Sequence, residues 1–523
     1  HCVALREVNF PERLREIEES AFYNCPSIKK LQFPEALIKI GALAFYQCSG
    51  LKEIELKATI EYVGNLAFAK SGIRKAWVFG SGKKYGADIF GECKKLSCLL
   101  LEEGVKHIPD KLAYGCTALE KVMLPTSLES AGICAWEGTK FLKEWLEKGE
   151  ISPILWDGRN LEGEVWVPRE VRIIAGGAFY GNAKITKVVL PENIGFIGKA
   201  AWKGCRNLIQ VEWPSQITEI EPEVFSGCVE LTEVLDKKKQ IPIWKEIGDR
   251  TFYQCRKLQE ICLEQIGRVG KEGLAGCSRL KIGKVKEGFL LKERAFEGTG
   301  FLQNKGNNCL SLGDIVISGA GCVGEVYLPE EVTGIAPFAF SGNRNLTRLI
   351  LPKGLKWIGE GAFFGCSALT EVEFPERLVF IGERAFEKCS SLHFVHTGAE
   401  YIGKKAFAFC SSMEKAELPM VNILTEGIFE GCGALKSCIC KKVEAIGERS
   451  FRGCIKLEEF DFCNIRQIEA YAFEGCDSLK RIVFQHCTFI EEYAFWDCGR
   501  LEELYFLDQA DVILQEYAFP GCT

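Results

Sequence analysis

The chain repeats one short pattern about every 22 to 23 residues over its whole length. An aromatic residue recurs in this pattern, usually after an Ala, and a Cys usually follows it three positions later, as at Phe45 and Cys48 or at Phe473 and Cys476. A period of this length is typical of solenoids, in which each unit packs only against its neighbours. The repeat constrains the fold because a single unit of this size cannot bury its own apolar residues.

Each unit also predicts one short strand. After Cys366, the apolar residues Val372 and Phe374 alternate with glutamates, and Pro375 follows. An alternation of this kind indicates a half-buried strand, and proline ends it because proline cannot donate a hydrogen bond to a sheet. Counting the aromatic position gives about 21 units of 22–23 residues. The sequence therefore predicts a repeat solenoid, a curved rod with a continuous parallel β-sheet on its concave face.

Two units are about twice as long as the others. Trp136 and Phe179 are 43 residues apart and Phe296 and Phe340 are 44 apart, where the regular spacing is about half of that. The two long stretches begin and end with similar sequences, so we interpret them as one expanded unit that is used twice, each with an extra strand near residues 154–156 and 315–317. We expect one continuous solenoid with these segments: 1–138 regular repeats, 139–168 expanded unit, 169–298 regular repeats, 299–329 expanded unit and 330–523 regular repeats.

The repeat resembles a known family. The pattern that runs from Leu369 through Val372, Phe374 and Pro375 to Ile381 and Gly382, and then to Phe386 and Cys389, is similar to the leucine-rich repeats of the BspA-like family of bacterial surface proteins. The resemblance covers essentially the whole chain. It implies a right-handed leucine-rich-repeat solenoid and, on function, adhesion or host-protein binding outside the cell.

Composition excludes several functions. The net charge is −6, and the 26% of residues that are charged are spread evenly, without the basic face that a nucleic-acid partner would need. No apolar run reaches 18 residues, so the sequence predicts no membrane span.

Of the 26 cysteines, 17 follow the aromatic residue, and we expect them to be small buried side chains and not disulfide partners. Both ends of the chain fall within a unit, and we expect it to be truncated at both ends.

The sequence offers one candidate binding surface and no candidate catalytic centre. We find no nucleophile, acid–base pair or metal-ligand spacing, so we expect no enzyme activity, no metal and no cofactor. Between the two inward positions of each strand, one residue is expected to point outward to the concave surface. This column is apolar at Val78, Leu100 and Met123, and at Val189 past the first expanded unit. A contiguous exposed apolar patch often marks an interaction site, although apolar residues also suit strands in general.

We therefore predict a non-enzymatic scaffold that binds another macromolecule. The leading interpretation is a surface-exposed or secreted adhesin-like protein whose partner is a host or matrix protein and not a nucleic acid. The alternative is a recognition or sensor module of a larger multidomain protein whose effector domain lies outside this chain. An enzyme within the solenoid is the third possibility, and it would need a cluster of carboxylates or histidines that the sequence does not show. The extracellular or cell-surface location follows from the resemblance alone.

Overall fold

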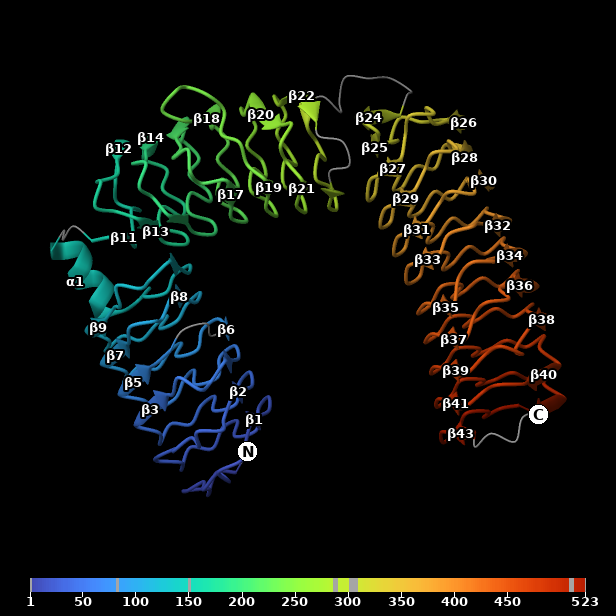
Figure 1. Cartoon of the computed structure of the whole chain (residues 1–523), viewed down its shortest axis with the longest axis horizontal. Helices are drawn as coiled ribbons and strands as arrows, with labels where there is room; N and C mark the ends of the chain where they lie inside the picture. Colours follow the sequence, from blue (N-terminus) through green and yellow to red (C-terminus); the bar gives the residue numbers. More distant parts are fainter. Residues whose placement is uncertain are drawn as a thin grey trace. The chain divides into compact units, whose positions relative to one another are not determined.

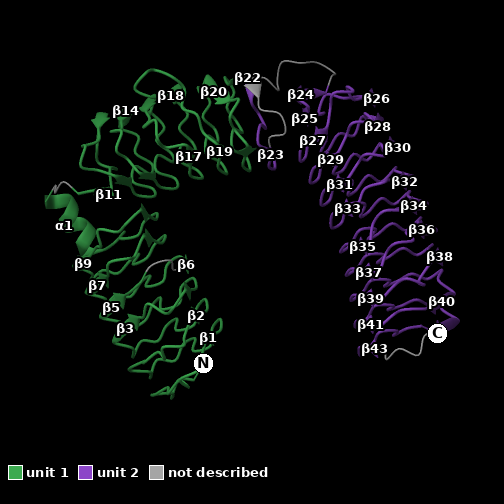
Figure 2. Cartoon of the chain, in the orientation of Figure 1, with its two compact units in different colours: residues 1–283 green, residues 284–523 purple. Residues whose placement is uncertain are grey.

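A computed structural model describes residues 2–80, 84–148, 152–285, 290–300, 309–507 and 512–522. The chain divides into two compact units, residues 1–283 and 284–523 (Figure 2). Both units are built from coils that each contribute a strand to two separate parallel ladders (Figure 1). The prediction of a leucine-rich-repeat solenoid with parallel strands is confirmed, and the described residues contain little helix.

The first ladder, here called the long-strand ladder, contains the alternating strands that the repeat predicts. Its strands are β3 (Glu53–Leu56), β5 (Lys75–Val78), β7 (Cys98–Leu101), β9 (Lys121–Met123), β12 (Gly163–Trp166), β14 (Ile185–Val189), β16 (Gln210–Glu212), β18 (Glu233–Leu235), β20 (Glu260–Leu263), β22 (Lys281–Val285), β26 (Gly324–Tyr327), β28 (Leu346–Ile350), β30 (Glu371–Glu373), β32 (Phe394–His396), β34 (Lys415–Glu417), β36 (Ser437–Ile439), β38 (Glu459–Phe460), β40 (Arg481–Phe484) and β42 (Glu503–Phe506).

The second ladder, here called the short-strand ladder, lies at the Ile-Gly step of the repeat. Its strands are β1 (Glu16–Ile17), β2 (Lys39–Ile40), β4 (Tyr62–Val63), β6 (Lys84–Tyr85), β8 (His107–Ile108), β10 (Ser130–Ala131), β11 (Ile154–Leu155), β13 (Ile173–Ile174), β15 (Phe196–Ile197), β17 (Glu219–Ile220), β19 (Glu246–Ile247), β21 (Arg268–Val269), β23 (Leu290–Leu291), β25 (Ile315–Ser318), β27 (Gly334–Ile335), β29 (Trp357–Ile358), β31 (Phe380–Ile381), β33 (Tyr401–Ile402), β35 (Ile423–Leu424), β37 (Ala445–Ile446), β39 (Gln467–Ile468), β41 (Phe489–Ile490) and β43 (Ile513–Leu514). Strand β24 (Leu310–Leu312) pairs with β25 in antiparallel fashion.

The long-strand ladder differs from the expected sheet in two respects. It is not continuous, because among the described residues its strands group into separate sheets such as β3-β5-β7-β9 and β12-β14-β16-β18. Within the first unit it also follows the outer side of the curve, and the short-strand ladder follows the inner side (Figure 1). The alternating pattern predicted a strand with one buried face, and it did not determine which side of the coil becomes concave.

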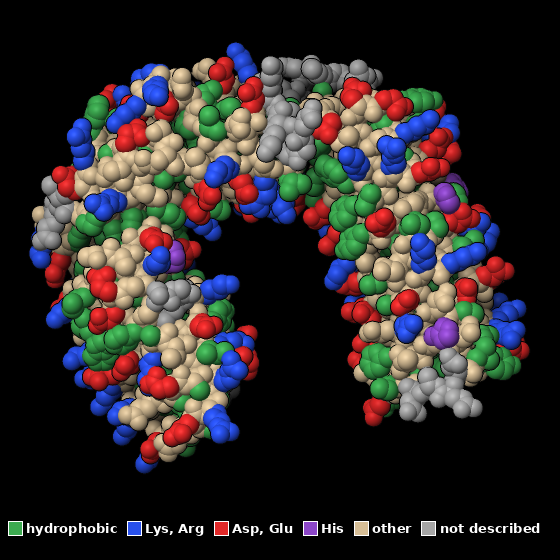
Figure 3. All heavy atoms as spheres, in the orientation of Figure 1, with side chains coloured by type: hydrophobic (Ala, Val, Ile, Leu, Met, Phe, Trp, Pro, Cys, Tyr) green, Lys and Arg blue, Asp and Glu red, His purple; other side chains and the backbone are tan. Residues whose placement is uncertain are grey.

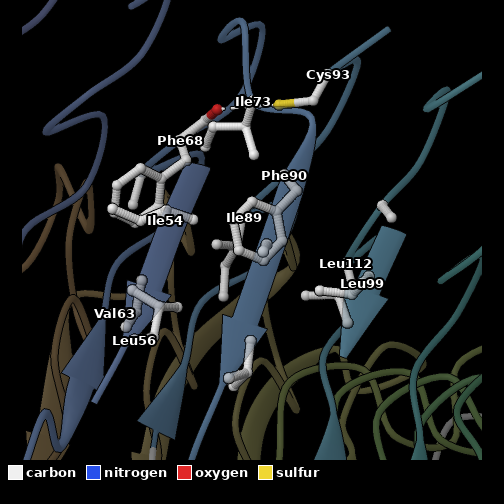
Figure 4. Packing of buried hydrophobic residues seen from close by; sticks show 14 of the residues in the cluster. Ile54, Leu56, Val63, Phe68, Ile73, Ile89, Phe90, Cys93, Leu99 and Leu112 are labelled. Atoms are coloured by element: carbon white, nitrogen blue, oxygen red, sulfur yellow. Dashed lines mark hydrogen bonds between the residues drawn. The ribbon is translucent and has the colours of Figure 1, made fainter. Parts of the chain in front are cut away.

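Columns of identical residues fill the space between the ladders. Rings at the aromatic position stack on one another, with centroids 4.9 Å apart for Phe363 and Phe386 and 5.3 Å apart for Phe386 and Phe407. Most of the cysteines that follow them are buried, and most of these thiols donate to the carbonyl of the aromatic residue one coil earlier, as from Cys93 to Phe68 at 3.2 Å (Figure 4). The column cysteines are free thiols, as predicted. Outside the column, Cys309 and Cys322 form a disulfide that the sequence analysis did not anticipate.

The first expanded unit begins with a helix in place of a long strand. Thr139 takes the cysteine position, and helix α1 (Lys140–Lys148) follows it directly. The Thr139 hydroxyl accepts a hydrogen bond from the Leu142 amide at 3.1 Å and donates to the Trp136 carbonyl at 2.6 Å. A threonine that accepts a hydrogen bond in the first turn is a favourable N-cap. The coil after that of β9 therefore has this helix where a long strand would stand, and the β3-β5-β7-β9 sheet ends at β9.

The expanded unit contains a complete extra coil. The extra strands predicted near residues 154–156 and 315–317 are confirmed as β11 and β25, and both belong to the short-strand ladder. In the extra coil Gly158 takes the aromatic position, because its amide donates to Ala178 at 2.6 Å as that of Phe179 donates to Ala201 at 2.8 Å. Gly319 has the same place in the second expanded unit. Residues 149–151 and 301–308, which also belong to these units, lie outside the described part of the chain.

Candidate functional site

The candidate surface lies on the long-strand ladder of the first unit. Parallel pairing aligns Glu55, Trp77, Leu100 and Met123 on the neighbouring strands β3, β5, β7 and β9. Alternation turns these four side chains away from the core, while the residues on either side of them in sequence point inward. Met123 is 53% exposed, and Trp77 and Leu100 are half-buried. Three large apolar side chains therefore form a row on adjacent strands.

Val78 does not belong to this row. Its partner on β7 is Leu101 and its side chain is 3% exposed, so its assignment to the outward column is wrong. The coil of Phe68 has only one residue between Ser71, at the cysteine position, and Ile73, where most coils have two. This deletion moves the strand back by one position, and a one-residue shift exchanges the two faces of a strand. Trp77 therefore occupies the outward position.

Val189 lies in the expected column but on another sheet. It pairs with Trp166 on β12 and Glu212 on β16, yet only 7% of it is exposed. Helix α1 and the extra coil separate its sheet from that of Met123. Trp166 is the exposed member of this column, at 67%, with the Lys187 ammonium 5.9 Å from its ring centre. The structure thus brings together Leu100 and Met123, but neither Val78 nor Val189.

A second row on the surface, made of aromatic side chains, was not predicted from the sequence. In the second unit, the residue that precedes the Ile-Gly step is Trp357, Phe380 and Tyr401 in three successive coils. The rings of Phe380 and Tyr401 stack at 5.2 Å and remain 39% and 50% exposed. The sequence signal is an aromatic residue directly before Ile-Gly, which alternation on the long strands could not reveal. The equivalent positions of the first unit are mostly polar or charged, as at Glu16, Lys39 and His107.

Acidic and basic side chains both surround these rows, and neither sign predominates. Beside the apolar row of the first unit, Glu53, Lys75 and Lys121 are exposed on the same strands. Acidic and basic side chains are mixed over the visible face of both units (Figure 3). Many pair between neighbouring coils, as Lys436 and Glu414 do at 2.8 Å, and this contact lowers the pKa of the Glu414 carboxyl. A surface of this kind favours a partner recognised by shape and apolar contact over one recognised by its charge.

The described residues provide no arrangement suited to catalysis by a metal. No group of three or more His, Cys, Asp or Glu side chains in the described part of the chain is placed to hold a metal ion. His396, one of the five histidines, lies on β32 with its Nδ1 2.9 Å from the Glu417 carboxylate. This pair is exposed on the long-strand ladder. Among the described helices, none is long and apolar enough to cross a membrane.

Parallel ladders, stacked aromatic columns and exposed side-chain rows define a leucine-rich-repeat protein, a fold that is typically a non-enzymatic binding scaffold. The chain matches the family model of the BspA type leucine rich repeat region in six copies, at residues 1–97, 80–151, 149–281, 240–306, 311–436 and 400–523. It therefore belongs to the BspA type leucine-rich repeat family, as its resemblance to that family predicted. No curated protein matches the chain.

Several solved structures are similar to the chain. A leucine rich repeat protein of T. pallidum is 30% identical, over 32% of this chain and 82% of its own, with a TM-score of 0.29. A leucine rich cell surface protein of Faecalibacterium prausnitzii is 19% identical, over 82% and 83% of the two chains, with a TM-score of 0.24. The pneumococcal vaccine antigen PcpA is 13% identical, over 88% and 89%, with a TM-score of 0.28.

Proposed function

We propose that this protein is a non-enzymatic, surface-exposed or secreted scaffold that binds a host or matrix protein. The observation that carries the proposal is the row Trp77, Leu100 and Met123, which presents large apolar side chains on three adjacent strands of a rigid ladder. Aromatic residues and methionine are enriched in protein interfaces because they bury much area and adapt to a partner. The surface location rests on membership of the BspA type family.

The geometry of the row suits a flat protein partner. Neighbouring parallel strands are about 4.8 Å apart, so three side chains cover a strip about 10 Å long. The half-buried Trp77 and Leu100 are held by their neighbours, which reduces the side-chain entropy that binding would cost. The exposed Lys75 and Lys121 on the same strands supply a polar rim. Hot spots in protein interfaces have this form, an apolar centre with a polar surround.

The test uses the full chain and a panel of purified extracellular-matrix proteins on a sensor surface. We expect at least one of them to bind, and we expect Leu100→Asp with Met123→Asp to weaken that binding at least about tenfold, or 1.4 kcal/mol. The matched control is Ile439→Asp, which changes an outward residue of the same ladder in the second unit that is 41% exposed. Binding that survives the double substitution, or is lost equally in the control, would contradict the proposed site.

A further inference from the structure

The extra coil of the first expanded unit is too short to follow its neighbours. Gly158, at the aromatic position, comes three residues after Leu155 at the end of β11. In the next coil, Phe179 comes five residues after Ile174. Ala175 still donates to Leu155 at 3.0 Å, but Gly176 donates past the extra coil to Ala131 at 2.9 Å. The extra coil therefore leaves the stack at this turn.

A cavity of about 460 Å³ lies where the turn is shortened. Its apolar wall contains Ile133, Trp136, Leu142 and Trp156, and Trp136 and Trp156 meet edge to face with centroids 5.8 Å apart. Both indoles are buried, while Tyr180 at the same cavity is 49% exposed. Cavities of 300–1,000 Å³ with apolar walls and a few polar groups are the usual form of small-molecule sites.

Each charged side chain of the cavity is paired with a side chain of opposite sign. They are Glu137, Asp157, Arg159 and Lys203, two of each sign. The Arg159 guanidinium donates to Asp157 at 2.9 Å and to Glu137 at 3.2 Å, and these contacts raise its pKa further. Lys203 donates to Glu223 at 3.0 Å. An ionic ligand would have to break one of these pairs, so the cavity has no preference for net charge.

From this geometry we infer that the cavity binds a neutral, polyhydroxylated ligand, a saccharide unit. Paired carboxylates keep free lone pairs, and Arg159, Lys203 and the Tyr180 hydroxyl keep donor capacity, so the rim presents donors and acceptors side by side. Sugar hydroxyls both donate and accept, and the C–H faces of a sugar ring suit the apolar wall of Ile133 and Trp156. This site is separate from the row proposed to bind protein, and either proposal can fail without the other.

The second expanded unit repeats the construction. Val316 and Gly319 are three residues apart, and a cavity of about 350 Å³ lies at the corresponding turn. Arg294, two residues before the aromatic position Phe296, lines it. Cys134 has the same relation to Trp136, in the equivalent coil, and lines the first cavity. The cavity with the larger side chain at this position is the smaller one, so the position provides a means to fill the first cavity.

The decisive variant is therefore Cys134→Tyr. Cys134 has a φ of 52°, and tyrosine already occupies the same position with φ of 59° at Tyr471 and 58° at Tyr493, so the backbone accepts it. The matched control is Lys405→Tyr, at the same position of a regular coil with φ of 55°. A second variant, Arg159→Gln, removes the guanidinium and leaves the volume of the cavity almost unchanged.

The assay is saturation-transfer NMR on the full chain with glucose, galactose, N-acetylglucosamine, lactose and diacetylchitobiose, and with inorganic phosphate and indole as comparators. We expect at least one neutral sugar to bind at millimolar concentration. We expect Cys134→Tyr and Arg159→Gln to weaken it at least about tenfold, or 1.4 kcal/mol, and Lys405→Tyr to leave it unchanged. Far-UV circular dichroism establishes that the variants are folded. The inference is overturned if no sugar binds, if only phosphate or indole binds, or if Cys134→Tyr binds as the parent does.

Discussion

Replacement of Asn182 by cysteine, the residue that most coils have at this position, is expected to destabilise the protein. Asn182 follows Phe179 by three residues, and it is 4% exposed. Its amide donates to the carbonyls of Gly158 and Leu161 at 2.9 and 2.8 Å, and its Oδ1 accepts from the amides of Lys184 and Ile185 at 2.7 and 3.3 Å. The side chain thereby ties the extra coil to the regular array.

The magnitude follows from these four hydrogen bonds. In the next coil, the Cys205 thiol makes one such bond, to the carbonyl of the aromatic position one coil earlier, at 3.0 Å. A thiol at position 182 would retain only the equivalent bond to Gly158, and three bonds would be lost. At about 1 kcal/mol each, and with some gain from the more apolar cysteine, Asn182→Cys should cost about 2 to 3 kcal/mol.

Hydrogen exchange measures this cost locally, because long repeat arrays do not always unfold in one step. A loss of 2 to 3 kcal/mol lowers the protection of the Lys184 and Ile185 amides about 30- to 150-fold. Asn207→Cys is the control, since Asn207 is exposed and donates a single hydrogen bond, to Ala183 at 2.7 Å. If Asn182→Cys is as stable as the parent or more stable, as the repeat consensus would suggest, the reasoning is refuted.

Two further predictions concern the buried columns. Phe386→Ala removes a fully buried ring between Phe363 and Phe407 and should cost about 3 to 5 kcal/mol in denaturant unfolding. Phe380→Ala, at a 39% exposed ring, should cost about 1 kcal/mol or less, and equal losses would show that burial of the ring does not set the cost. Burial raises the pKa of the Cys366 thiol to about 12. An unfolded thiol ionises near pH 8.5. The buried neutral thiol therefore makes its full contribution to the free energy of unfolding below that pH, and this contribution is lost as the pH rises toward the folded pKa. Above about pH 9, Cys366→Ala should lose stability more slowly than the parent, by about 1.4 kcal/mol per pH unit, and equal slopes would show that burial of this thiol does not govern its ionisation.

The repeat predicted the fold because every level of the sequence indicates the same coil. The alternation at Val372 and Phe374, the proline that ends the strand and the aromatic column at Phe386 are each satisfied only when neighbouring coils stack. The side of the coil that becomes concave was not predictable in this way, because it depends on the relative widths of the two sides of the stack. No single residue indicates which side of the stack is wider.

The outward rows were only partly predictable for a related reason. Leu100 and Met123 were assigned correctly to the outward face, since their coils keep the regular spacing before the strand. Val78 was misplaced because one residue is missing before its strand, and the residue count alone does not show where a deletion falls. The row of Trp357, Phe380 and Tyr401 lies on strands of two residues, which are too short for alternation to be visible.

The expanded unit depends on a pair of residues that violate the repeat together. Gly158 replaces the aromatic residue, and a side-chain carbon there would lie 2.4 Å from the Phe179 ring, so the glycine makes room for the ring of the next coil. Asn182 then replaces the cysteine and bonds the carbonyls that the shortened turn leaves free. Gly319 and Asn343 repeat both substitutions, with Asn343 donating to Gly319 and Cys322 at 2.8 Å each. Neither change is useful alone, because an aromatic residue in the short turn would clash with the next ring and a cysteine would leave the turn unsatisfied. A glycine followed 24 residues later by asparagine at the cysteine position is therefore the signature of a shortened coil, and of the cavity that it opens.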